Sequence, residues 1–307
     1  MGDESADRFL TCVVKRSEND LIIRIGALIL IMLVVPLVAI LLLLDAIWVY
    51  NTYFADPTKV IDLPVFIFDH LDHFAGAHLM EYTVGTFLMY MIIKAYVDHE
   101  KRDLVWMDSL IDYAEYRGHD AGKMKGIRDN VRSKSARKVK KAFLIWFILV
   151  IVATACQALF ISLRDMDPQS AVLVINVLIF EIMVQIIFTG AYLQRKTVKL
   201  TDLQCRFSEA FHESMKGDFP EMEPMRLEVK EIKVIYTIIL NIVTLGIFGL
   251  FHLFWAVSEL NLHIRTQWMY ELALVRAVGK NEKVAGVEKV PPVDESRLQA
   301  LVRRILS

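Results

Sequence analysis

The sequence lacks the motifs on which most enzymes depend. It contains three cysteines, and Cys12, Cys156 and Cys205 lie too far apart to form a paired metal or redox motif. It has no glycine-rich phosphate loop, nucleophile elbow or cofactor fingerprint. Its formal net charge of −1 gives no overall attraction to nucleic acid. We therefore expect no cofactor and no nucleic-acid partner, and an enzyme is the less favoured class.

Charged residues are almost absent from five long apolar stretches, in which Glu81 and Glu181 are the only formal charges. A helix needs about 20 mostly apolar residues to cross a bilayer, and each stretch reaches that length. We predict an all-α, polytopic membrane protein in the cell membrane, with the lipid bilayer as a partner. The stretches are Ile25 to Leu44, Phe74 to Ile93, Ala142 to Leu163, Pro168 to Gln194 and Val234 to Ser258.

The distribution of Lys and Arg predicts the orientation, because basic loops stay in the cytoplasm. The loop 46–73 has one basic residue, whereas the loop 94–141 has thirteen. Gly246 and Gly249 divide the fifth stretch, which we predict to be a kinked helix that spans or re-enters the bilayer. The expected order is a cytoplasmic N-terminal arm (1–24), a transmembrane hairpin (25–93), a cytoplasmic helical hairpin (94–141), a second transmembrane hairpin (142–194), a cytoplasmic amphipathic helix with a linker (195–233), the fifth apolar helix (234–258) and an amphipathic tail (259–307).

The fifth stretch also contains a short motif. Residues 244–251 read Thr-Leu-Gly-Ile-Phe-Gly-Leu-Phe, and Trp255, Glu259, Leu260 and Asn261 follow. This pattern resembles the signature of a small uncharacterised prokaryotic membrane domain, which reads Thr-Leu-Gly-Ile-Tyr-Gly-Leu-Tyr-Trp before a Lys-rich helix that ends in Glu-Leu-Asn. The Lys expected after Trp255 is missing here. The resemblance covers residues 234–261 and implies a prokaryotic membrane setting, but no reaction.

The loop 94–141 divides into an acidic and a basic half. Asp98 to Arg117 holds six acidic residues, and Lys123 to Lys141 holds nine basic residues against one acid. Between them, Gly118 can end one helix and Asp120 can cap the next. We expect an antiparallel helical hairpin with an apolar seam formed by Leu104, Met107, Ile111, Ala114, Ile127, Val131 and Val139.

Glu181 is the strongest single candidate for chemistry, because an unpaired charge inside an apolar helix is costly. Gln185 lies one turn later on the same face, so the two would form an intramembrane polar stripe. Glu181 would act either as a proton or cation site or as a structural hydrogen bond between helices.

Two further groups could bind ligands. His70, His73, His78 and Glu81 would share one face of a helix and could bind zinc, with water completing the shell; solvation at the interface is the alternative. The basic half of the hairpin could contact anionic lipid through Lys134, Arg137, Lys138, Lys140 and Lys141, and neutralisation by the acidic half is the alternative there.

Three functions follow from these observations. The first is a non-enzymatic scaffold, sensor or assembly platform that binds membrane or cytoplasmic proteins, or a second copy of itself, through cytoplasmic helices. The second is a proton- or cation-coupled transporter or channel built around Glu181. The third is a zinc-dependent enzyme at the outer face. The length of the amphipathic, motif-free segments favours the first.

Overall fold

The computed structural model describes residues 4–16, 20–26, 28–30, 71–133, 148, 151–152, 155, 168–229, 232–244 and 247–281. Every regular element among these residues is helical. The helices are α1 (Glu4–Val14), α5 (Leu71–Tyr116), α7 (Pro168–Met215), α8 (Val234–Val243) and α9 (Ile247–Asn281), with one more helix over residues 122–133.

The described helices contradict the prediction of a polytopic membrane protein, because none of them is long and apolar enough to cross a bilayer. The apolar stretches 74–93 and 168–194 do not form separate spanning helices. They are the first parts of α5 and α7, which continue as polar and amphipathic helices to Tyr116 and Met215. The predicted multi-pass location in the cell membrane is corrected on the same ground.

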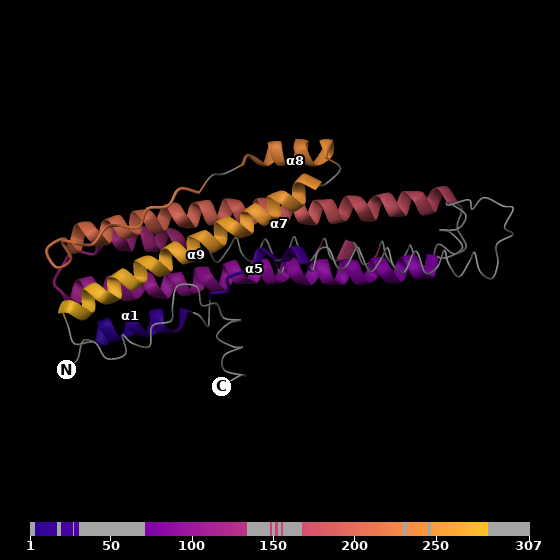
Figure 1. Ribbon diagram of the computed structural model, residues 1–307. Helices are drawn as coiled ribbons and strands as arrows, with labels where there is room; N and C mark the ends of the chain where they lie inside the picture. The colour runs from indigo at the N-terminus through magenta and orange to yellow at the C-terminus, as the bar shows by residue number, and fades with distance from the viewer. Residues whose placement is uncertain are drawn as a thin grey trace, which may run out of the picture. The chain divides into compact units, whose positions relative to one another are not determined.

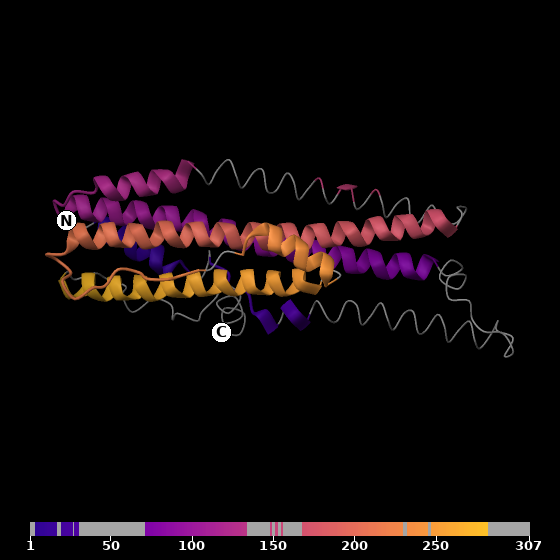
Figure 2. The same ribbon diagram turned by 90° about the horizontal axis from the view of Figure 1, so that it is seen from above.

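The chain divides into two compact units. The first contains residues 1–23, 92–142 and 190–307, and the second contains residues 24–91 and 143–189. In the first unit, α9 runs alongside the later parts of α5 and α7, and α1 lies against the same group (Figures 1 and 2). The second unit includes residues 71–91 of α5 and 168–189 of α7.

One apolar core joins the helices of the first unit. Trp106 of α5 is fully buried, with its ring centroid 5.6 Å from that of Phe207 of α7 and 6.2 Å from that of Tyr270 of α9. The N-terminal helix adds Phe9, and the linker after α7 adds Phe219. The large aromatic surfaces that leave water here stabilise the arrangement of these helices.

The acidic and basic halves of the loop 94–141 pair with each other in the structure. Gly118 adopts a φ of +80°, a left-handed conformation that favours glycine and turns the chain after α5. Asp120 Oδ1 accepts a hydrogen bond from Gly122 N (2.8 Å) at the start of the next helix. Arg128 and Arg132 both form ion pairs with Asp108 across the pair of helices.

The stretch 234–258 forms two helices and not the single kinked helix expected. α8 ends at Val243, α9 begins at Ile247, and Figure 1 shows the chain reversing between them. Thr244 supports the reversal, because its N–H donates to Leu240 O and its Oγ1 accepts from Phe248 N (3.0 Å). The backbone N–H of Thr244 thus bonds the last turn of α8, and its side chain caps α9.

Candidate functional site: a buried charged cluster

The structure does not describe the side chains of the residues that the sequence singled out for chemistry. Glu181 and Gln185 lie on α7, and His73, His78 and Glu81 lie on α5, but only their backbone is placed. His70 is outside the described residues, as are the basic residues proposed for lipid contact: Lys134, Arg137, Lys138, Lys140 and Lys141. The transporter, zinc and basic-arm lipid hypotheses therefore stay predictions.

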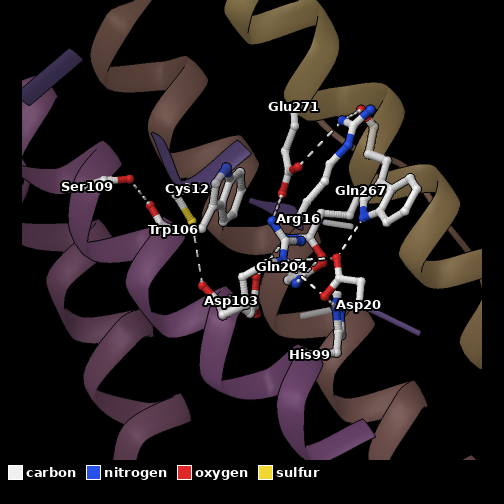
Figure 3. Close-up of polar contacts among 12 residues, drawn as sticks. Cys12, Arg16, Asp20, His99, Asp103, Trp106, Ser109, Gln204, Gln267 and Glu271 are labelled. Atoms are coloured by element: carbon white, nitrogen blue, oxygen red, sulfur yellow. Dashed lines mark hydrogen bonds and ion pairs between the residues drawn. The ribbon is translucent and has the colours of Figure 1, made fainter. Parts of the chain in front are cut away.

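A different set of polar side chains meets inside the first unit (Figure 3). Arg102 of α5 is at its centre and is 4% exposed. Its Nη1 donates to Oε1 of Glu271 on α9 (2.7 Å), and its Nε lies 3.0 Å and 2.9 Å from the two carboxylate oxygens of Asp20. One guanidinium group therefore joins α5 to α9 and to the segment after α1.

Asp20 receives hydrogen bonds from three residues, although it lies outside any regular helix. In addition to the bond from Arg102, its Oδ1 accepts from His99 Nδ1 (2.9 Å) and its Oδ2 accepts from Trp268 Nε1 (2.6 Å). These donors come from α5 and α9. Charged donors make strong bonds to a carboxylate, so Asp20 fixes the position of the N-terminal segment.

Arg16 is a second buried cation in the cluster. Its guanidinium lies 4.7 Å from the centroid of the Trp268 ring, and its Nη1 donates to the carbonyl oxygen of Trp268 (3.1 Å). The same nitrogen lies 3.8 Å from Oε2 of Glu271. The two arginines thus lie on either side of the Glu271 carboxylate, which is completely buried.

A chain of hydrogen bonds connects Asp103 to α9 and α7. Gln267 Nε2 donates to Asp103 Oδ1 (2.8 Å), and Gln204 Nε2 donates to Gln267 Oε1 (3.1 Å). All three side chains are fully buried. This chain of hydrogen bonds extends the cluster to a third long helix, α7.

The rings of His99 and His263 lie edge to face, with their centroids 5.2 Å apart. Thr201 Oγ1 lies 2.8 Å from His263 Nδ1 and donates its own proton to Thr197 O (2.8 Å). A hydroxyl has one proton, so when Thr201 donates to Thr197 O, His263 Nδ1 is the donor to Thr201. His263 Nε2 is buried and has no hydrogen-bond partner within the described part of the chain.

Burial is the largest influence on the pKa values in the cluster. It raises the pKa of Asp103 and of Glu271, although Arg102 opposes it in both cases. Burial also acts on Asp20, but the Arg102 charge and His99 outweigh it and lower the pKa of Asp20 to about 2. Burial, with repulsion from His99, lowers the pKa of His263 well below its usual value. At neutral pH Asp20 is therefore ionised and His263 is neutral.

The sequence analysis missed this cluster, although the helical periodicity contains a signal for it. The apolar stripe through Met107 and Ile111 continues toward the N-terminus, at steps of four residues, to Asp103 and His99. The stripe through Val275 continues in the same way to Glu271, Gln267 and His263. Polar residues that follow a buried stripe indicate a buried polar network.

Among the described residues, no group of three His, Cys, Asp or Glu side chains is placed to hold a metal ion. Comparisons with family models, with curated proteins and with solved structures give no match to this chain. The function must therefore be argued from the geometry of the cluster.

Proposed function

We propose that this protein is a non-enzymatic helical scaffold in which the buried cluster works as a proton sensor. The sensor holds the N-terminal segment (residues 4–23, of which the structure describes 4–16 and 20–23) against α5 and α9 at neutral pH and loosens it on acidification. The observation that carries this proposal is the buried set of bonded ionisable side chains from the N-terminal segment, α5 and α9, with the neutral His263 beside it.

The burial of the cluster supports a sensor more than a catalytic site. Arg16, Asp20 and Glu271 are 0% exposed, so a substrate could reach them only after the helices separate. Replacing a buried ion pair with apolar residues is often neutral or stabilising, so such pairs are not explained by stability alone. A role in specifying one arrangement of helices, or in switching it, is better supported.

His263 is the group that would take up the proton. Its Nδ1 donates to Thr201, so a second proton must bind at Nε2, which is buried without a partner. The charged ring would face His99 and lie near Arg102, and these groups disfavour a positive charge. A state in which the ring reaches water avoids this cost, so acid favours the opened state.

The size of the effect follows from linkage. A histidine with a normal pKa near 6.5 in the opened state and a much lower pKa in the closed state favours opening by about tenfold between pH 7.5 and pH 5.5. The closed state has its full stability above about pH 6.5 and loses it as the pH falls toward the pKa that His263 has in the closed state. Asp103 and Glu271 act in the opposite direction, because burial raises their pKa.

Hydrogen exchange tests the proposal, with His263→Asn as the main variant. This change keeps an N–H donor near the position of Nδ1 and removes the titration, whereas Asp103 and Glu271 are unchanged. Amides of residues 4–23, corrected for intrinsic rates, should lose about tenfold protection from pH 7.5 to pH 5.5 in the wild type. The loss should be absent in His263→Asn and unchanged in His212→Asn, the same substitution at a half-buried histidine.

Two results would contradict the proposal. One is protection of residues 4–23 that does not change with pH in the wild type. The other is an equal loss in wild type and His263→Asn, which would assign the effect to another group. The scaffold role predicts, in addition, that the set of co-purifying proteins differs between the two pH values in the wild type only.

A further inference from the structure

Helix α8 has the reverse of the usual distribution of polar and apolar side chains. Apart from Tyr236, the helix has two residues with hydrogen-bonding side chains, Thr237 and Asn241. They are 0% and 3% exposed. Asn241 Nδ2 donates to Thr237 O (2.7 Å), so the polar groups bond within the helix. The exposed positions hold Ile235, Tyr236, Ile238, Ile239, Leu240, Ile242 and Val243, with Ile242 70% and Val243 73% exposed.

The exposed face of α8 continues onto the first turns of α9, where Phe251 is 66% exposed. We call Ile235, Tyr236, Ile239, Ile242, Val243 and Phe251 the α8 face. Figures 1 and 2 show α8 beside the start of α9. Exposed apolar groups this close together mark an interaction surface.

Basic side chains lie at the base of α8. Gln194 Oε1 accepts from Ile232 N (3.3 Å) and lies 2.9 Å from His252 Nε2, so the chain entering α8 is held against α7 and α9. Lys233 follows Ile232 and Arg195 follows Gln194 in the chain, and both basic side chains are exposed. Lys196 lies at the same level of α7, with its Nζ 5.6 Å from the centroid of the Tyr192 ring.

We propose that the α8 face docks on an anionic lipid surface, with α8 lying in the interface and the basic residues at its base contacting the headgroups. An apolar face next to Lys and Arg is the pattern of helices that lie at the boundary between headgroups and acyl chains. The face offers one hydrogen-bonding group, the Tyr236 hydroxyl, whereas protein interfaces usually have several. Ten residues span about 15 Å, so α8 contacts the lipid without crossing it.

Vesicle co-sedimentation of the full chain tests this proposal. We expect binding to phosphatidylcholine vesicles that contain phosphatidylserine, reduced at least tenfold by Ile239→Asp with Ile242→Asp. Val105→Asp is the matched control, because Val105 is an apolar residue of α5 that is 59% exposed and does not belong to the α8 face, so this change should leave binding unchanged. Arg195→Gln with Lys233→Gln should weaken binding to anionic vesicles and reduce its salt dependence, with little effect on neutral vesicles.

The same experiment distinguishes the other occupants of the face. Absence of vesicle binding by the wild type overturns the proposal, and so does equal binding by wild type and Ile239→Asp with Ile242→Asp. Self-association that this double variant abolishes, without vesicle binding, would assign the face to a second copy of the chain. Hydrogen exchange of residues 4–23 tests the proton sensor separately, so either proposal can fail alone.

Discussion

Removal of Arg102 is the most direct test of the buried cluster. In Arg102→Met, the side chain keeps a similar length but loses its charge and its bonds to Asp20 and Glu271. Asp20 would keep its bonds from His99 and Trp268, whereas Glu271 would keep its contact with Arg16, whose Nη1 lies 3.8 Å from Oε2. Removing one partner of a buried pair costs about 3–5 kcal/mol, because a charge is left without compensation.

Urea denaturation followed by circular dichroism measures this cost. The midpoint should fall with little change in the m value, because the surface exposed on unfolding is similar. Arg206→Met is the matched control: Arg206 pairs with Asp202 at 3.1 Å on the surface, with side chains 64% and 53% exposed. Exposed pairs contribute at most about 1 kcal/mol, so this variant should remain close to the wild type.

Two further variants make the result specific to charge. Arg102→Lys keeps the positive charge but lacks the planar guanidinium group that contacts two carboxylates at once. Because the charge remains, Arg102→Lys should destabilise the protein less than Arg102→Met. Arg102→Met combined with Glu271→Met should be more stable than Arg102→Met alone, because one uncompensated carboxylate is removed. A loss below about 1 kcal/mol in Arg102→Met would refute the reasoning.

Three other predictions concern the turn, the core and acid stability. Gly118→Ala should lower the free energy of unfolding by about 1–2 kcal/mol, because Gly118 has a φ of +80°. Gly126→Ala, in an exposed helical position, should raise it by up to about 1 kcal/mol. Urea denaturation tests the turn, because the two changes in the free energy of unfolding should have opposite signs. Trp106→Ala should cost about 3–5 kcal/mol in the same assay, and a cost near zero would exclude Trp106 from the core. From about pH 4 to pH 2 the wild type should lose about 2 kcal/mol more stability than Asp20→Asn. The reason is that the pKa of Asp20 in the folded protein, about 2, lies below the ordinary value of 3.8. Equal loss in the two proteins would contradict that pKa.

Local sequence patterns predicted much of the first unit. The helical periodicity of Met107, Ile111 and Ala114 marks a face that is buried in the structure. Gly118 and Asp120 indicated the turn and the cap that are observed. These features depend on contacts between residues that are close in sequence, so the chain carries them locally.

The membrane architecture could not be decided from apolar runs. Hydropathy describes a stretch of chain, whereas the length and polarity of a helix depend on where it ends and on what covers it. The run 234–258 contains no Asp, Glu, Lys or Arg, but Thr244 lies between two separate helices. Residues 74–93 and 168–194 proved to be parts of longer helices with polar continuations.

The amino-acid sequence alone determined that the described chain is helical, where the loop 94–141 turns and which face of each amphipathic segment is apolar, because these properties repeat at the period of a helix. Only the tertiary structure brought Arg16 and Asp20 together with Arg102 and Glu271. Asp20 and Arg102 are 82 positions apart, and Arg102 and Glu271 are 169 apart. No local pattern pairs charges over such distances, because the pairing depends on how the helices pack.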